Sequence, residues 1–271
     1  MQDLRITIIQ SQLVWENSEL NLENFSARIE SLTDETDLIV LPEMFSSGFS
    51  MNPQLIAQPM DGQAVAWMKA TALNKNCVVC GSLAIVEDGR YYNRFIWAAP
   101  DGSLLHYDKK HLFTFAGEHL HYTAGVSRQV FELNGWKISP LICYDLRFPV
   151  WSRNRYSKEN GYEYDCLLYV ANWPEARSHA WRILLMARAI ENQSFVVGVN
   201  RVGADGNQIA YSGDSAVLDP LGENLSSLMP FSDGMQTIVL SRGQIDSYRE
   251  KFNQRADWEN FSLASTTQSE Q

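Results

Sequence analysis

Apolar runs that fit buried strands alternate with helical patterns along most of the chain. The runs at 6–9 and 38–41 predict strands, and apolar residues at helical spacing between positions 20 and 32 predict a helix between them. Further strands are expected at 166–170, 195–200, 216–219 and 237–240, and further helices at 63–75, 178–192 and 242–252. This interleaving predicts an α/β fold rather than separate helical and sheet domains.

Other strands follow one another directly, joined by turn sequences. Asp-Gly pairs at 88–89 and 101–102, and Asn-Gly at 134–135, separate the expected members. These strands are expected at 78–86, 91–99, 104–107, 130–133 and 136–142. Hairpins make antiparallel pairs, whereas helical crossovers make parallel ones. We therefore expect mixed sheets.

The chain has 271 residues, 45% of them hydrophobic, which is enough for one large core. Neither a linker nor an internal repeat interrupts it, so we expect a single domain over residues 1–252. From 253 to 271 the sequence turns polar. We expect this tail to be extended or disordered, or to lie on a partner subunit.

Charge and apolar patterning exclude several classes of partner. The chain carries 22 basic and 32 acidic residues, a net charge of −10, with no basic stripe for nucleic acid. We find no apolar stretch long enough to cross a membrane, and residues 1–10 lack the features of a signal peptide. Three of the four cysteines lie in apolar runs, as expected for a reduced, cytoplasmic protein.

The segment 138–149 places Cys143 where an expected buried strand ends. A helix is expected to begin near Pro149 and to reach about Lys158. The free N–H groups at the start of a helix favour both a thiolate and an oxyanion, so the thiol is placed for nucleophilic chemistry. A cysteine that merely fills the core is the commoner alternative.

Two other segments place charged residues at expected strand ends. Glu43 follows the strand 38–41, where apolar surroundings would raise its pKa toward neutrality, as suits a general base. Lys109 and Lys110 follow the strand 104–107, and whichever of them projects inward would place its ammonium group on a developing oxyanion. Taken alone, each is explained better as a solvated surface residue, slightly so for Glu43 and clearly so for the lysines.

Together, these segments resemble the nitrilase superfamily of carbon–nitrogen hydrolases, over residues 4–252. Glu43 after Leu-Pro, Lys109 and Cys143 match the family's catalytic glutamate, lysine and nucleophile. The resemblance implies a four-layer αββα sandwich with two mixed sheets. It also implies that Glu118 is a second glutamate, which orients the lysine and the substrate, and that the backbone N–H of Tyr144 helps to hold the oxyanion.

Four further segments resemble the omega-amidase branch of the superfamily, of the bacterial YafV type: 171–174, 178–181, 187–193 and 211–215. This implies a cysteine-dependent amidase that hydrolyses the ω-amide of a small dicarboxylic acid, such as 2-oxoglutaramate or succinamate, through a thioester. Neither a metal nor an organic cofactor is implied. Deaminated-glutathione amidases share the Cys-Tyr-Asp motif and stay open as an alternative.

A substrate of this class ends in a carboxylate, which an arginine fork binds best. Arg177 is the preferred candidate, because it follows the loop at 172–174 after an expected strand. Arg201 is another, and Arg147 is expected mainly as a structural ion pair. Trp173 and Phe113 are expected to wall the pocket, although core packing explains them equally well.

The resemblance also implies a homodimer or higher oligomer. Trp151 and Tyr156, together with the carboxyl-terminal segment, are candidates for the subunit interface, with burial inside one subunit as the alternative.

Rival functions remain open at this stage. A papain-like hydrolase would take its base from His106, His111, His119, His121 or His179. A metal site would draw on Glu118, His119 and His121, with His111 nearby, or on the pair Cys77 and Cys80. A non-catalytic binding module would keep the fold without the chemistry.

Overall fold

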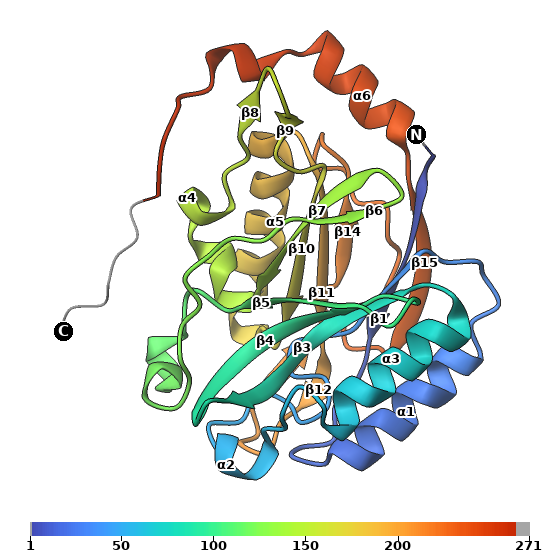
Figure 1. Cartoon of the computed structure of the whole chain (residues 1–271), viewed down its shortest axis with the longest axis vertical. Helices are drawn as coiled ribbons and strands as arrows, with labels where there is room; N and C mark the ends of the chain where they lie inside the picture. Colours follow the sequence, from blue (N-terminus) through green and yellow to red (C-terminus); the bar gives the residue numbers. More distant parts are fainter. Residues whose placement is uncertain (1, 264–271) are drawn as a thin grey trace.

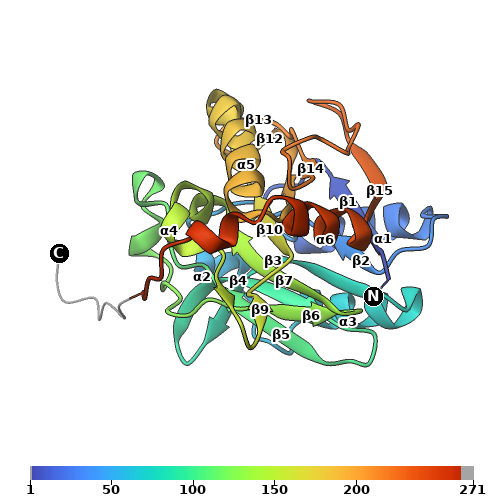
Figure 2. The ribbon, with the colours of Figure 1, turned by 90° about the horizontal axis from the view of Figure 1, so that it is seen from above.

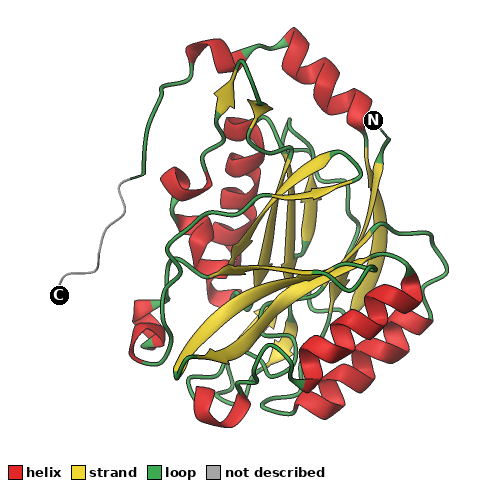
Figure 3. Cartoon of the chain, in the orientation of Figure 1, coloured by secondary structure: helices red, strands yellow, loops and turns green. Residues whose placement is uncertain are grey.

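The computed structural model describes residues 2–263, and its first sheet mixes parallel and antiparallel strands (Figures 1 and 3). Its central strands β1, β2 and β3 run parallel, because helices return the chain between them. The outer strands pair antiparallel with their neighbours. The order across the sheet is β15 (Gly234–Leu240), β1 (Leu4–Gln10), β2 (Leu38–Val40), β3 (Val78–Glu87), β4 (Arg90–Ala98) and β5 (Leu104–Asp108).

The second sheet follows the same plan. Parallel strands β7, β10 and β11 form its centre, and antiparallel strands form its edges. The order is β14 (Ala216–Leu218), β11 (Phe195–Asn200), β10 (Cys166–Ala171), β7 (Trp136–Ile142) and β6 (Phe131–Leu133). Both sheets are therefore mixed, as the hairpins and crossovers predict.

The two sheets pack face to face, and helices cover their outer faces (Figure 2). Ile6 and Leu141, from different sheets, belong to one buried cluster. The first sheet also packs outward on α1 (Ser18–Glu30) and α3 (Gln63–Lys75), and the second on α5 (Ser178–Asn192). Because both faces of each sheet are buried, the central strands are almost continuously apolar. The predicted αββα sandwich is confirmed.

The segment after Cys143 differs from the long helix that we expected. It forms a 3₁₀ helix, η3 (Cys143–Arg147), a single turn, α4 (Pro149–Ser152), and a small hairpin of β8 (Tyr156–Ser157) and β9 (Gly161–Tyr162). Arg153 adopts an extended backbone (ψ 127°) and ends the turn. The backbone N–H of Asn154 then donates to Asn192 Oδ1 instead of to a helical carbonyl, and its side chain bonds the backbone of Tyr164 and Asn192.

Several short elements complete the fold. They are α2 (Pro53–Ile56), the hairpin of β12 (Val202–Ala204) and β13 (Ala210–Ser212), α6 (Arg242–Lys251), and the 3₁₀ helices η1 (Thr114–Ala116), η2 (Glu118–Leu120), η4 (Glu175–Arg177) and η5 (Gln254–Asp257). No helix within residues 2–263 is both long and apolar enough to span a lipid bilayer.

Part of the expected tail packs against the rest of the chain. The ring of Trp258 meets Tyr162 of β9 edge-on at 5.7 Å, and the Arg153 guanidinium lies over Trp258. The positions 264–271 lie outside the described residues. The division into a domain ending at 252 and a separate tail therefore stays a prediction.

Candidate active site

Strand ends from both sheets bring Glu43, Lys109 and Cys143 together. Glu43 lies three residues beyond β2, Lys109 follows β5, and Cys143 follows β7. Lys109 Nζ donates to Glu43 Oε1 at 2.9 Å, and both charges act on the Cys143 thiol. The glutamate and the lysine are 0–1% exposed, whereas the cysteine is partly exposed. The side chains predicted from separate segments thus meet in one place.

The Glu43 carboxylate is held by hydrogen bonds on both oxygens. Asn93 Nδ2 and Lys109 Nζ donate to Oε1, at 2.8 and 2.9 Å, and the backbone N–H of Asn172 donates to Oε2 at 2.7 Å. Asn172 comes from the second sheet, so it also ties the two sheets together. These three hydrogen bonds fix the orientation of the carboxylate and leave a lone-pair site on it for a proton.

Glu118 reaches the same lysine from the loop that follows β5. Lys109 Nζ lies 3.0 Å from each Glu118 oxygen, and the backbone N–H of Phe113 also donates to Oε2. The loop closes where Gly125 N–H donates to Lys109 O at 2.8 Å. A Cβ on Gly125 would lie 2.1 Å from Asp108 O, so only glycine permits this closure.

The buried cluster of Glu43, Lys109 and Glu118 contains one cation and two carboxylates, so its net charge is negative. This negative charge shifts the pKa values of the groups in the cluster. Burial by itself would lower the pKa of Lys109, but Glu118 and Glu43 outweigh burial and raise it. Burial raises the pKa of Glu118, and the nearby Glu43 adds to that rise. Lys109 therefore stays a fixed cation at neutral pH.

The Cys143 thiol is protonated in the resting site. Burial and the Glu43 carboxylate raise its pKa well above the ordinary value, and Lys109 offsets only part of that rise. The helix expected from Pro149 to about Lys158 is only one turn long, so it adds little to stabilise a thiolate. A base must accordingly remove the proton during the reaction.

The backbone at Cys143 is left-handed, with φ of 43°. A non-glycine residue in that region costs about 1–3 kcal/mol, so surrounding contacts must hold it. Asp145 supplies them: its carboxylate accepts from the Ile142 N–H at 3.0 Å, from Tyr107 Oη at 2.8 Å, and from the backbone N–H of His111 at 3.0 Å. Asp145 thereby joins the cysteine turn to the segment that carries Lys109.

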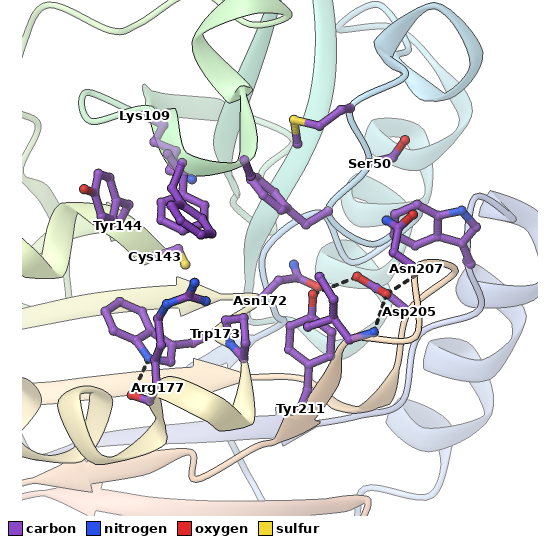
Figure 4. Close-up of a pocket in the computed structure, with 18 of the residues that line it drawn as sticks. Ser50, Lys109, Cys143, Tyr144, Asn172, Trp173, Arg177, Asp205, Asn207 and Tyr211 are labelled. Atoms are coloured by element: carbon purple, nitrogen blue, oxygen red, sulfur yellow. Dashed lines mark hydrogen bonds between the residues drawn. The ribbon is translucent and has the colours of Figure 1, made fainter.

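A cavity of about 530 Å³ opens over the thiol (Figure 4). Aromatic side chains make up much of its wall, among them Phe113, Tyr144 and Trp173. Tyr144 is the second residue of η3, and the first N–H groups of a helix lack partners inside it. That N–H is available beside the thiol, where an oxyanion would form.

Two arginines line the cavity without carboxylate partners among residues 2–263. The Arg177 guanidinium lies 5.5 Å from the Phe113 ring centre, and that of Arg147 lies 4.8 Å from the Trp173 ring centre. The expected structural ion pair of Arg147 is therefore not formed within this part of the chain. Arg201 is fully buried and instead donates to backbone carbonyls of Leu13 and Ala204.

Within residues 2–263, none of the histidines hydrogen-bonds Glu43, Lys109 or Cys143. His111 bonds Asp145 and stacks on Phe148 at 3.7 Å, and the other four are exposed. Nowhere in residues 2–263 do three His, Cys, Asp or Glu side chains gather as metal ligands. Cys77 and Cys80 are buried in the core, and burial raises the pKa of Cys77 to about 11.

Trp151 and Tyr156 also have partners within the chain. Trp151 is buried and donates from its indole to Tyr107 Oη at 3.1 Å. Tyr156 packs edge-on against Tyr162 at 5.2 Å. Burial within one subunit therefore accounts for Trp151.

Two asparagines in the site were missed from the sequence. Asn93 sits in β4 and bonds Glu43 and Glu118, and Asn172 bonds Glu43 from the end of β10. An asparagine within a buried strand is unusual, because strands disfavour it, and that was the available signal for Asn93. Asn172 was visible only as part of the segment 171–174.

Comparison with known proteins agrees with this geometry. The carbon–nitrogen hydrolase family model matches residues 5–250. The chain is 46% identical to the omega-amidase YafV of Escherichia coli K12 over 97% of this chain and 100% of that protein. It is 35% identical to the 2-oxoglutaramate amidase of Bacillus subtilis, over 82% of this chain and 85% of that one.

A solved structure is similar over the same extent. A CN-hydrolase superfamily protein of Xanthomonas campestris, with an arsenic adduct in its active site, superposes with a TM-score of 0.95 at 43% identity. The alignment covers 97% of this chain and 100% of that one. The chain is a member of the carbon–nitrogen hydrolase family, within the nitrilase superfamily.

Proposed function

We propose that the protein is an omega-amidase that hydrolyses 2-oxoglutaramate and related ω-amides, such as succinamate, to the acid and ammonia. The observation that carries this is the thiol beside the Glu43–Lys109–Glu118 cluster, in a cavity that also holds two arginines without carboxylate partners in the described chain. Relatives named omega-amidase and 2-oxoglutaramate amidase support the substrate class.

Acylation begins when Glu43 takes the proton of the Cys143 thiol. The sulfur attacks the amide carbon, and the oxygen that becomes negative is held by Lys109 Nζ and the Tyr144 N–H. Each such donor is typically worth about 10²–10³ in rate. Glu43 then gives its proton to the nitrogen, the C–N bond breaks, and ammonia leaves a thioester behind.

Deacylation repeats these steps with water. Glu43 takes a proton from a water molecule, the hydroxyl attacks the thioester carbon, and the proton returns to sulfur as the C–S bond breaks. Glu118 keeps Lys109 charged and oriented throughout. The chemistry proposed here uses only side chains and backbone groups of this chain.

Specificity for an anionic substrate follows from the two arginines that line the cavity. A carboxylate, with a keto group beside it, would pair with Arg177 and also with Arg147, while Trp173 and Phe113 pack against the short carbon chain. Both guanidinium groups already lie over aromatic rings, which limits their motion without using up their N–H donors.

Ammonia release from 2-oxoglutaramate tests the proposal. We expect rapid release, slower release from succinamate, and little from glutamine or deaminated glutathione, with none in the Cys143→Ala variant. Equal rates across these amides would contradict the proposed specificity, and no release from any of them would contradict the activity.

We further propose that the protein is cytoplasmic and at least dimeric. The outer side of α5 supports an interface: Ile183, Met186 and Ile190 lie on one side of the helix and are at least 40% exposed, beside Leu221 at 54%. Sedimentation equilibrium of the wild type and of a Met186→Lys, Ile190→Lys variant tests this. A monomeric wild type would contradict the proposed oligomer. A variant with the molecular mass of the wild-type oligomer would contradict the interface on α5. Fractionation of cells tests the location.

A further inference from the structure

Asn172 uses both of its donor groups on Glu43 and leaves its acceptor free. Its backbone N–H donates to Glu43 Oε2 at 2.7 Å, and its Nδ2 donates to the Glu43 backbone carbonyl at 2.5 Å. The residue is only 4% exposed, yet its Oδ1 oxygen has no partner among residues 2–263. Buried carbonyl groups are nearly always paired, so this oxygen calls for a partner.

The orientation of the Asn172 amide is determined by the same contact. Exchanging its nitrogen and oxygen would place two carbonyl oxygens 2.5 Å apart, which is strongly repulsive. The atom without a partner is therefore the oxygen Oδ1, and it can form a hydrogen bond only with a donor group.

The position of this oxygen is next to the reacting groups. Val170 pairs with Ile142 in the parallel register of β10 and β7, so Asn172 leaves the sheet beside the Cys143 turn. Asn172 and Cys143 line the same cavity (Figure 4). Since Oδ1 and Nδ2 belong to one amide group, the free oxygen lies close to the Glu43 backbone, while the Asn172 backbone N–H holds the Glu43 carboxylate.

The proposed reaction brings a donor to this place. When the amide carbon sits on the thiol and its oxygen turns to Lys109, the nitrogen must approach Glu43 to collect a proton. A primary amide nitrogen carries two N–H groups, whereas the Glu43 oxygens already accept from Asn93, Lys109 and Asn172. At least one substrate N–H therefore needs another acceptor.

We propose that Asn172 Oδ1 accepts a hydrogen bond from the N–H of the scissile amide, which makes it the subsite for the leaving nitrogen. This inference rests on the proposed function and adds a basis for selectivity. The hydrogen bond directs the nitrogen lone pair toward protonated Glu43 as the C–N bond breaks. An ester presents an oxygen without hydrogen at this position, so Asn172 favours amides over esters of the same acid.

Asn93 provides a matched control. It too donates to Glu43, from Nδ2 to Oε1 at 2.8 Å, but its Oδ1 already accepts from Ser82 Oγ at 2.8 Å. Both asparagines thus hold the base, and only one has an acceptor to offer. Replacing either by alanine disturbs Glu43, but only the loss at Asn172 distinguishes amides from esters.

The test compares succinamate with monomethyl succinate, both followed by succinate release, in the wild type, Asn172→Ala and Asn93→Ala. The measured quantity is kcat/KM, which reports the acylation step. The ratio of kcat/KM for the amide to kcat/KM for the ester does not depend on how much of a variant is folded. We expect Asn172→Ala to lower this ratio by about tenfold, the worth of one hydrogen bond, and Asn93→Ala to leave it unchanged.

The other outcomes are distinct. An unchanged ratio in Asn172→Ala, with both substrates slowed equally, would show that Asn172 only positions Glu43 and would overturn the inference. An equal fall in the ratio in both variants would overturn it as well. A wild-type protein that cleaves neither substrate would instead refute the proposed function, and the inference with it.

Discussion

Two buried clusters, each with three charges, hold this molecule together at different places, and one of them adjoins the cavity over Cys143. The Lys109 cluster consists of Glu43, Lys109 and Glu118, whose side chains are 0–1% exposed. The Asp165 cluster consists of Asp165, Arg242 and Arg249, whose side chains are 6–9% exposed. The first carries one cation and two anions, and the second carries the reverse.

The Asp165 cluster is a structural anchor. Asp165 directly precedes β10, and both arginines belong to α6, so their bonds of 3.1 and 2.6 Å fasten that helix to the second sheet. Arg242 lies over the Trp136 ring at 3.9 Å and Arg249 over the Tyr162 ring at 3.8 Å. Every charge there is buried, and the neighbouring Cys166 thiol is itself fully buried, with its pKa raised by burial and by the Asp165 charge.

The contrast shows that buried charge alone does not identify a catalytic site. The Lys109 cluster adjoins Cys143, whose proton still has to move, and a cavity whose arginines lack carboxylate partners within residues 2–263. We therefore expect damage to the first cluster to appear mainly in activity, and damage to the second mainly in stability.

The largest expected effect comes from Glu43→Gln, which keeps the shape of the side chain and removes its basicity. We expect kcat/KM for 2-oxoglutaramate to fall by about 10²–10⁴-fold, the usual worth of a general base. The midpoint of urea unfolding should change little or rise, because one buried negative charge is lost from a cluster with a net negative charge. Activity within tenfold of the wild type would rule out Glu43 as the base.

In the Asp165 cluster, the change that corresponds to Glu43→Gln is Asp165→Asn, which also replaces a carboxylate by an amide of the same shape. It leaves two buried arginines without their anion, so we expect the free energy of unfolding to fall by about 3–5 kcal/mol in urea titrations. Turnover per folded molecule should stay at the wild-type level. A loss of kcat without a loss of stability would contradict the division between the clusters.

The same pair predicts a pH dependence of stability. Although burial opposes it, the neighbouring Arg249 and Arg242 hold the pKa of Asp165 below its ordinary value. Because the pKa of Asp165 is lower in the folded state than in the unfolded state, its carboxylate stabilises the folded state at pH values above the unfolded-state pKa of about 3.9. This contribution to stability is lost as the pH falls through the folded-state pKa. The stability gap between wild type and Asp165→Asn should accordingly narrow below about pH 4 in acid unfolding curves. A constant gap would contradict this assignment.

A smaller effect on activity is expected when one of the two arginines that line the cavity is replaced. Arg177→Gln should lower kcat/KM for 2-oxoglutaramate by about 10–100-fold, the worth of one charge-assisted hydrogen bond. Butyramide, which lacks a carboxylate, should be cleaved slowly but equally by both proteins. Equal losses on the two substrates would indicate that Arg177 shapes the cavity rather than binding the anion.

The smallest expected effect is a change in the pKa of the Cys143 thiol. The Glu43 carboxylate raises the pKa of Cys143, so Glu43→Gln should lower that pKa and increase the thiolate fraction although activity falls. Thiolate absorbance in the ultraviolet, corrected with Cys143→Ala, measures it. A higher pKa in Glu43→Gln would mean that Glu43 stabilises the thiolate instead of accepting its proton.

The sequence by itself determined the layers and the order of the elements. The helices expected at 63–75 and 178–192 are α3 and α5, with the same bounds. Prediction from the sequence failed after Cys143, where the side chain of Asn154 bonds distant backbone groups. Bonds of that kind depend on neighbours brought in by the fold, which local propensity does not contain.

The same division applies to the site. Glu43, Lys109 and Cys143 follow expected strands, and the resemblance to the family singled them out together with Glu118. Only the tertiary structure showed that the two carboxylates share one lysine, that Asn93 and Asn172 hold the base, and that the thiol rests protonated. Proton affinity depends on burial and on charges from distant segments, and these exist only once the two sheets have packed together.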